Sequence, residues 1–466
     1  MELAGIDIFD ILTAIDQFIW GPPLLILLVG TGIFLTWKLG MIQVFRLPLA
    51  LKYVLNSRKA EIGVQGDVSS FAALSTALSA TIGTGNIVGV ATALKTGGPG
   101  ALFWMLFAAF FGMATMYSES LLAVKYRTVD ANGQMSGGPM YYIRDGLKEK
   151  KYSRVLASVF AFFGVSVSLF GIGIFPQVNA IVDSARIAFD IPEVLSAAVI
   201  SLLVAFVTLG GIRRIAAVAQ FLVPFMAAGY VLGCVLVIGL NLEKVPETLA
   251  LIISSAFTGT AAQGGFLGAG VMLAIRIGIA RGVFSNESGL GSAPIAAAAA
   301  KVKEPARQGL ISMTGTFFDT FIICLMTGTV LIITDSWKGE LAGAYMTSYA
   351  FSTVLSEIGS YIVTVGLICF AFTTILGWNY YGERCTEFLF GVKGILPYKL
   401  VYILIVASGA FLTLDVIWVL ADIVNGLMAI PNLIALLALR KVIASETRQY
   451  FKKLEAETSN TTKVSK

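Results

Sequence analysis

Two stretches of glycine and small hydroxyl residues interrupt long apolar segments of this 466-residue chain. The first, Ser79 to Asn86, reads SATIGTGN, and the second, Ser285 to Pro294, reads SNESGLGSAP. Such residues weaken a helix, and unwound backbone at membrane depth is tolerated only where it lines a cavity or binds a ligand. Taken singly, each stretch could also be a small-residue packing face of the GxxxG kind. The occurrence of two favours the binding interpretation.

A broken helix offers binding groups for both signs of charge. One half presents free N–H groups and the other presents free C=O groups. The amides of Thr84 and Gly85 are placed to hold a carboxylate, and carbonyl groups from about Ser79 to Ile82 are placed to hold a hard cation. An amino-acid zwitterion together with Na⁺ satisfies both ends.

A pair of threonines supplies further oxygen atoms for the cation. The hydroxyls of Thr373 and Thr374 could join the backbone oxygens of Ser79, Ile82 and Phe370, because position 370 lies on the same helical face. Ligation by oxygen alone suits a hard ion. Alternatively, the two hydroxyls only bond carbonyls of the preceding helical turn, which is common for threonine in membrane helices.

The composition indicates an all-α, polytopic membrane protein. Apolar residues make up 57% and charged residues 13%, with a mean hydropathy of +0.83, whereas soluble domains contain about 45–50% and about 25%. The chain has no histidine, and its four cysteines lack CxxC spacing, which argues against metal clusters, haem ligation and histidine-dependent nucleophiles. A net charge of +5 is too small to suggest nucleic-acid binding. We therefore expect neither an enzyme nor a nucleic-acid partner.

Stretches of about 20 apolar residues predict eleven membrane helices. They centre on residues 18–38, 68–94, 100–124, 155–180, 193–212, 215–240, 268–298, 308–333, 358–382, 400–418 and 421–439. The connecting loops alternate in Lys and Arg content, and the basic side is expected to be cytoplasmic. This places the N-terminus outside the cell membrane and the C-terminus in the cytoplasm.

The spacing of the two interrupted helices predicts an internal repeat. Five spans run from the first to the second, and five more follow to the end of the membrane region. Because five is odd, the second unit starts from the opposite side and is inverted, as in many transporters. We expect an extra N-terminal helix and cytoplasmic loop over 1–65, repeats over 66–240 and 264–442, and a polar cytoplasmic tail over 443–466.

Ionisable residues inside the spans are candidates for function. Glu119 and Asp319 are expected to pair internally and hold helices together, and Glu287 to accept N–H groups freed by the unwinding. Arg281 could form an outer gate with a carboxylate such as Asp415.

Three motifs resemble the alanine or glycine:cation symporter family, which shares the five-plus-five inverted repeat of the bacterial leucine transporter. They are ATIGTGNI at 80–87, GGPMYY at 137–142, and RGVFSNE at 281–287 continuing to Pro294. Together with Thr373-Thr374 and Trp378, the resemblance covers nearly the whole chain. It implies sodium-coupled uptake of L-alanine or glycine, with D-alanine left open, by alternating access.

The resemblance also implies roles for single residues. Thr84 and Gly85 would meet the substrate carboxylate, with Thr81 as a pocket wall. Asn286 and Gln177 would be polar pocket residues, and Trp378 would cap the substrate side chain. The family usually has asparagine three residues before this glutamine and no proline, whereas this chain reads GIGIFPQ at 171–177, which leaves the exact substrate open. Phe170 and Phe175 are further candidates for the pocket lining.

An alternative function is a proton-coupled or differently specific amino-acid transporter of the same fold. Without histidine, proton coupling would need a carboxylate such as Glu287 or Asp319. We expect a monomer whose partners are a small amino acid and membrane lipid, with Na⁺ as the coupling ion.

Overall fold

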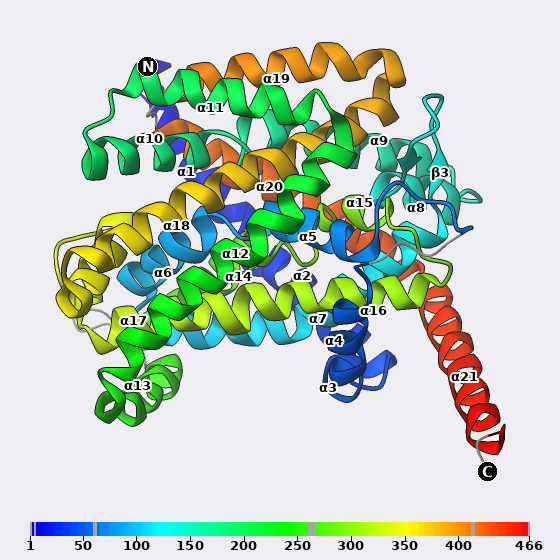
Figure 1. Ribbon diagram of the computed structural model, residues 1–466, viewed down its shortest axis with the longest axis horizontal. Helices are drawn as coiled ribbons and strands as arrows, with labels where there is room; N and C mark the ends of the chain where they lie inside the picture. The colour runs from blue at the N-terminus through cyan, green and yellow to red at the C-terminus, as the bar shows by residue number, and fades with distance from the viewer. Residues whose placement is uncertain (1, 4–5, 59–62, 259–266, 412–414, 465–466) are drawn as a thin grey trace.

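The computed structural model describes every residue except 1, 4–5, 59–62, 259–266, 412–414 and 465–466. Over this part of the chain the protein is helical apart from two short antiparallel pairs of strands. Long helices run along the longest axis of the molecule, and the last helix projects from one end (Figure 1). The predicted all-α polytopic fold is therefore confirmed.

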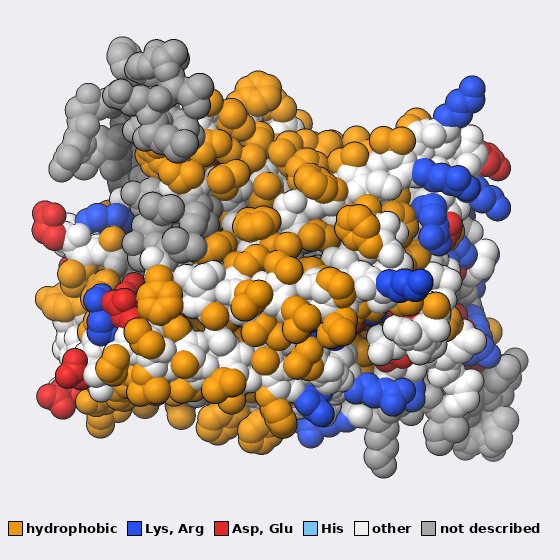
Figure 2. Space-filling view, turned by 90° about the horizontal axis from the view of Figure 1, so that it is seen from above, with side chains coloured by type: hydrophobic (Ala, Val, Ile, Leu, Met, Phe, Trp, Pro, Cys, Tyr) orange, Lys and Arg blue, Asp and Glu red, His pale blue; other side chains and the backbone are white. Residues whose placement is uncertain are grey.

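The described helices identify a multi-pass membrane protein. By length and composition, eight of them can cross a membrane, or nine if the bent pair Ser70–Thr81 and Gly85–Gly97 is one span. Glu193–Thr208 has 16 residues, fewer than the roughly 20 of a full span. The number eleven therefore stays a prediction. In Figure 2 hydrophobic side chains cover the middle of the visible face, and Lys and Arg gather mainly towards its right-hand end.

The segment before the first predicted repeat forms four helices and a pair of short strands. They are β1 (Glu2–Leu3), β2 (Ile6–Asp7), α1 (Ile8–Ile19), α2 (Pro22–Lys38), α3 (Ile42–Phe45) and α4 (Leu47–Asn56). The expected loop after residue 38 thus contains two short helices.

The first predicted repeat holds eight α-helices, one π-helical segment and a β-hairpin. They are α5 (Ser70–Thr81), η1 (Gly85–Gly89), α6 (Val90–Gly97), α7 (Gly100–Lys125), β3 (Thr128–Val129), β4 (Met135–Ser136), α8 (Pro139–Gly146), α9 (Ser153–Phe170), α10 (Phe175–Phe189), α11 (Glu193–Thr208) and α12 (Gly211–Gly239). The segments η2 (Leu242–Lys244) and α13 (Val245–Thr258) follow.

The second predicted repeat also contains a π-helical segment. Its elements are α14 (Leu267–Asn286), α15 (Ala293–Ala297), α16 (Pro305–Thr316), η3 (Phe317–Cys324), α17 (Leu325–Ile333), η4 (Ser336–Lys338), α18 (Gly343–Phe390), η5 (Val392–Gly394), α19 (Ile395–Gly409) and α20 (Asp415–Ala438). Within α18 the chain kinks at Ser356, which has φ 54° and ψ −145°.

The tail is a helix, α21 (Arg440–Val464), whose first turns pack against the membrane helices. The hydroxyls of Tyr117 and Thr447 are 2.9 Å apart, and the Tyr450 hydroxyl donates to that of Tyr53 at 2.7 Å. These contacts anchor the tail to α7 and α4.

Candidate binding site at the two helix breaks

The first break lies between α5 and η1. Ile82, with φ −78° and ψ 92°, leaves the helical conformation, and the two halves of the helix meet at a bend of 52°. The Gly83 amide donates to Oδ1 of Asn86 at 2.9 Å. The side chain of Asn86 thus replaces a helical acceptor that the break removes.

The second break lies between α14 and α15. Glu287, Gly289 and Gly291 adopt positive φ values of 57°, 90° and 85°, which a continuous α-helix cannot contain. Oδ1 of Asn286 accepts hydrogen bonds from the amide and hydroxyl of Ser288. Glu287 was expected to accept freed N–H groups, but the hydrogen bond that it receives comes from the Ser292 hydroxyl, at 2.6 Å.

The two breaks lie against each other. A Cβ added at Gly85 would stand 3.1 Å from Cα of Ser285, a tight contact that glycine avoids. Oδ1 of Asp319 accepts from Nδ2 of Asn86 at 2.7 Å, and Oδ2 of Asp319 accepts from Oγ of Ser285 at 2.9 Å. Nδ2 of Asn286 donates to Oγ1 of Thr320 at 3.0 Å. Residues of η3 therefore contact both breaks.

Gln177, in the first turn of α10, faces the first break. Its Oε1 accepts from the Thr84 amide at 3.3 Å, and its Nε2 donates to Oγ1 of Thr84 at 3.0 Å and to the carbonyl of Ile172 at 3.1 Å. The predicted residues Gln177, Thr84 and Gly85 are thus brought together.

The threonine pair of α18 faces the same break. Oγ1 of Thr374 lies 3.4 Å from the Ile82 carbonyl oxygen, and both hydroxyls lie 3.0 Å from the Phe370 carbonyl oxygen. The bonds to Phe370 are those expected of threonine in a helix, whereas the approach to Ile82 crosses between α18 and α5. Ser79 is buried in α5, and its hydroxyl bonds the carbonyl of Thr76.

A cavity of about 750 Å³ reaches the first break at Thr84. Its wall includes Asn179 and Asp183 of α10, and Tyr345 and Glu357 of α18. It extends to the loop before α18, the end where the Lys95 ammonium donates to the Gly339 carbonyl. A second space of about 10 Å³ is lined by Thr81 and Asn286.

Three aromatic candidates do not line the large cavity. Phe170, at the end of α9, is 54% exposed on the surface. Phe175 is buried near Gly409 of α19. Trp378 is fully buried near Gly173, with its ring 5.4 Å from that of Tyr381.

Arg281 pairs with Asp422, with Nη2 and Oδ2 3.0 Å apart. The side chain of Asp415 lies outside the described residues, so the structure gives Arg281 a different carboxylate from the one suggested by the sequence. This ion pair joins α14 to α20.

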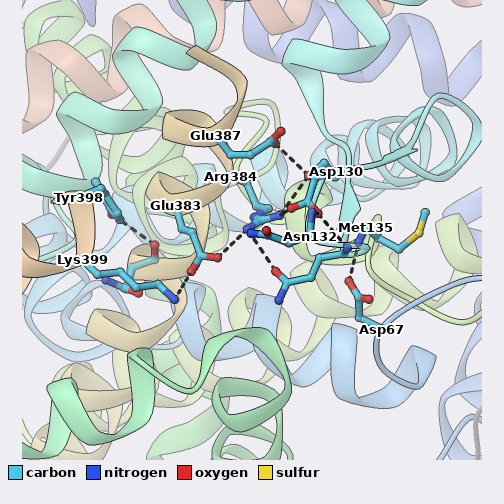
Figure 3. A network of polar contacts seen from close by, with 12 residues as sticks. Asp67, Asp130, Asn132, Met135, Glu383, Arg384, Glu387, Tyr398 and Lys399 are labelled. Carbon is cyan, nitrogen blue, oxygen red and sulfur yellow. Dashed lines mark hydrogen bonds and ion pairs between the residues drawn. The ribbon is translucent and has the colours of Figure 1, made fainter. Parts of the chain in front are cut away.

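A buried network of charges joins α18, α19 and the β3–β4 hairpin (Figure 3). Arg384 of α18 contacts Asp130 of the β3–β4 hairpin at 2.9 Å and Glu383 at 2.6 Å, and Glu383 contacts Lys399 at 2.9 Å. Asp67, just before α5, accepts from the Met135 amide at 2.8 Å, and burial raises the pKa of its carboxyl group above the usual value. The hairpin is therefore tied to both α5 and α18.

Sequence reasoning missed the roles of Asn86, Ser285 and Arg384. Asn86 and Ser285 belong to the two motifs, but no sequence pattern showed that both bond Asp319. Asp319 was expected to form an internal pair that holds helices together. The structure shows that it accepts hydrogen bonds from Asn86 at the first break and from Ser285 at the second.

Residues 7–464 match the sequence profile of the sodium:alanine symporter family. The chain belongs to this family. The symporter is 61% identical over 448 residues to an uncharacterised transporter of Haemophilus influenzae, covering 96% of this chain and 97% of that protein. It is 47% identical over 448 residues to the sodium/alanine symporter AgcS of Methanococcus maripaludis, covering 95% and 97%. It is 34% identical over 446 residues to the probable sodium/glutamine symporter GlnT of Bacillus subtilis, covering 95% and 90%.

Family membership confirms the resemblance predicted from the three motifs. The symporter is a multi-pass membrane protein that carries an amino acid with a cation. It is a transporter and not an enzyme, as expected from its composition.

Proposed function

We propose that the symporter takes up L-alanine or glycine together with Na⁺ by alternating access. D-alanine is a further candidate substrate. The observation that carries the proposal is the unwound segment 82–84, which lies between the Thr374 hydroxyl and the Gln177 side chain. One face of this segment offers oxygen atoms and the other offers N–H groups. The similarity to the sodium/alanine symporter AgcS supports the same substrate and ion.

The substrate carboxylate would bind at Thr84 and Gly85, where the second half of the broken helix begins. Thr84 lines the cavity of about 750 Å³, so a solute that enters the cavity would meet this residue. Gln177 now accepts the Thr84 N–H at 3.3 Å, a long hydrogen bond that a carboxylate would replace with a charge-assisted one. Thr81, Asn286 and Trp378, with Phe175, would form the closed side of the pocket, whereas the exposed Phe170 has no support from its position.

The Na⁺ ion would bind among the carbonyl oxygens of Ile82 and Phe370 and the hydroxyls of Thr373 and Thr374, with Ser79 one turn earlier. Four of these oxygens already gather between α5 and α18. Neutral oxygen ligands from both helices would let the ion hold the two helices together.

The large cavity would face the outside of the cell membrane. It extends to the loop before α18, whose one basic residue between Ile333 and Gly343 is Lys338, and loops poor in Lys and Arg are expected on the outer side. We further propose that the N-terminus lies outside the cell and the C-terminus in the cytoplasm. Residues 66–240 and 264–442 would form the two inverted repeats, with 1–65 before them and 443–466 after them. The symporter would act as a monomer.

A second candidate is proton coupling or specificity for another amino acid. The similarity to a probable sodium/glutamine symporter and the buried carboxylates Glu287 and Asp319 favour keeping it. Uptake that persists without Na⁺ and fails in Glu287→Gln would support this candidate.

Reconstituted uptake tests the proposal. In proteoliposomes, an inward Na⁺ gradient is expected to accumulate radiolabelled alanine or glycine. Changing Thr373→Ala and Thr374→Ala together is expected to raise the Na⁺ concentration for half-maximal uptake. Thr329→Ala is the matched control, because its hydroxyl only bonds the Leu325 carbonyl of its own helix. An unchanged Na⁺ dependence in the double variant would place the cation elsewhere.

A further inference from the structure

Asp319 is a fully buried carboxylate surrounded by neutral donors. It accepts hydrogen bonds from Nδ2 of Asn86 at 2.7 Å, from Oγ of Ser285 at 2.9 Å and from Oγ1 of Thr320 at 2.8 Å. Among the described residues, no Lys or Arg forms an ion pair with it. A buried anion without a cation is costly even when it is hydrogen-bonded, so this position favours a positive charge nearby.

Asn86 connects this carboxylate to the first break. The side-chain amide donates to Asp319 through Nδ2 and accepts the Gly83 N–H at Oδ1, at 2.9 Å. That N–H belongs to the same peptide unit as the Ile82 carbonyl. The Ile82 oxygen is the atom that faces Thr374 from across the break. One side-chain amide and one peptide unit therefore join Asp319 to the proposed Na⁺ site.

This chain of hydrogen bonds carries the effect of the Asp319 charge to the Ile82 carbonyl oxygen. A negative charge on Asp319 draws the Asn86 amide hydrogens towards it and makes Oδ1 more negative. Oδ1 then polarises the Gly83–Ile82 peptide, which makes the Ile82 oxygen a stronger cation ligand. Hydrogen bonds arranged in series strengthen one another in this way inside a protein.

We propose that Asp319 is the counter-charge of the coupling ion, acting through Asn86 and the peptide between Ile82 and Gly83. Asp319 is thus a positioning residue, because it touches neither Na⁺ nor the amino acid. The inference rests on the proposed Na⁺-coupled function and names the residue that sets the affinity for the ion.

The arrangement gives a physical reason for obligatory coupling. A zwitterionic amino acid adds no net charge to the site. With Na⁺ bound, the charges of the ion and of Asp319 sum to zero, so water can leave the site without leaving an uncompensated charge buried there. Without Na⁺, closure would isolate a bare carboxylate at the meeting point of both breaks, which disfavours closure around the amino acid alone.

The location of Asp319 agrees with such a role. Asn86 lies in the π-helical segment η1 and Asp319 in the π-helical segment η3, and the two side chains join these segments. Single π-helical turns occur frequently at functional sites. The Cys324 thiol also approaches Asp319, with Sγ and Oδ2 4.0 Å apart.

The test compares Asp319→Asn, Asn86→Ala and their combination in proteoliposomes. Each single variant is expected to raise the Na⁺ concentration for half-maximal alanine uptake by roughly 5- to 150-fold, the usual range for coupling between sites. The KM for alanine at saturating Na⁺ is expected to change by less than about twofold. Because both residues act in one chain, the double variant is expected to match the larger single effect and not their product.

Asp335→Asn is the control, because it removes an acidic side chain that pairs with Lys338 at an exposed position, away from the cavity lining and from the chain of hydrogen bonds. It is expected to leave the Na⁺ requirement close to that of the wild type. Na⁺-dependent thermal stabilisation of the detergent-solubilised protein measures ion binding without transport. If Asp319→Asn does not fold, Asn86→Ala, which keeps the carboxylate, decides by the same measurement.

The outcomes separate this inference from the proposed function. Wild-type uptake without any Na⁺ dependence would overturn the proposed function itself. Na⁺-dependent wild-type uptake, with an unchanged Na⁺ requirement in folded Asp319→Asn or Asn86→Ala, would overturn the inference alone. A loss of thermal stability with no shift in the Na⁺ requirement would also overturn it, because it would reveal a purely structural carboxylate.

Discussion

Nη1 of Arg384 lies 2.9 Å from Oδ2 of Asp130, and this ion pair ties α18 to the hairpin between β3 and β4. Both side chains are almost fully buried, with exposures of 1% and 0%. Arg384 also contacts Glu383, which in turn contacts Lys399 of α19 (Figure 3). The same helix carries Thr374 and Trp378, so the proposed ion site and this charge network lie on the part of α18 that follows its kink at Ser356.

Arg384→Met is expected to destabilise the symporter by about 3–5 kcal/mol, because removing one partner leaves Asp130 buried without its cation. Chemical unfolding in detergent measures this change. Arg186→Met is the matched control, since Arg186 pairs with Asp183 and Glu193 at an exposed position, where such pairs contribute about 0–1 kcal/mol. Equal losses in the two variants would contradict the assigned role of the buried pair.

Gly83→Ala is expected to abolish most uptake while the protein still inserts and folds. A Cβ at this position would clash with Oγ1 of Thr374 and stand 3.2 Å from Oε1 of Gln177. Overpacking of this kind costs about 1–3 kcal/mol. It would displace the Thr374 hydroxyl and the Gln177 side chain, which belong to the proposed ion and substrate sites. Gly89→Ala, six residues on, is the control, because its added Cβ would meet no atom within 4 Å. Similar alanine uptake by the two variants would exclude a tight contact at Gly83.

The helix breaks were accessible to sequence reasoning because their cause is local. Glycines and small hydroxyl residues weaken a helix wherever they occur, so the interruptions near Gly83 and Gly289 could be read directly. Their contact, through Gly85 and Ser285, followed only from the assumption of a transporter fold. The threonine pair of α18 was likewise placed opposite Ile82 because the paired breaks favour a binding site, since helical spacing accounts only for its contact with Phe370.

Long-range contacts explain what the sequence did not reveal. The partners of Asp319 lie 233 residues away at Asn86 and 34 residues away at Ser285. The hairpin residue Asp130 and Arg384 are separated by 254 residues. Hydropathy predicted a span over 193–212, where the structure has the 16-residue helix α11, and it did not reveal the kink at Ser356, because the length and bending of a helix depend on tertiary packing.

Gln177→Leu is expected to lower kcat/KM for alanine by about tenfold or more. The substitution removes the hydrogen bonds from Nε2 of Gln177 to Oγ1 of Thr84 and to the Ile172 carbonyl, which hold the unwound segment in place. It leaves buried acceptors unpaired, which costs about 1–3 kcal/mol. Initial rates of uptake at saturating Na⁺ measure the change. Gln43→Leu is the control, because it removes a buried glutamine whose side chain, among the described residues, bonds only Thr36 of the preceding helix. It is expected to leave alanine kinetics intact. An equal effect of the two substitutions would mean that Gln177 acts only through general stability.

Trp378→Ala is expected to relax the size limit for the substrate. Trp378 is fully buried beside Gly173, in the turn whose Ile172 carbonyl accepts from Gln177, so its ring fills space next to the proposed pocket. Removing the ring costs about 3–5 kcal/mol of stability if the gap stays empty. It should also let a larger amino acid bind, because a pocket gains about 1–3 kcal/mol for each methylene that it accommodates.

Competition of unlabelled leucine and glutamine with radiolabelled alanine measures this change in selectivity. Trp37→Ala serves as the control, because Trp37 is 75% exposed on α2 and its loss should leave the order of competitors unchanged. A variant at position 378 that loses stability but still discriminates against leucine as the wild type does would assign Trp378 to helix packing.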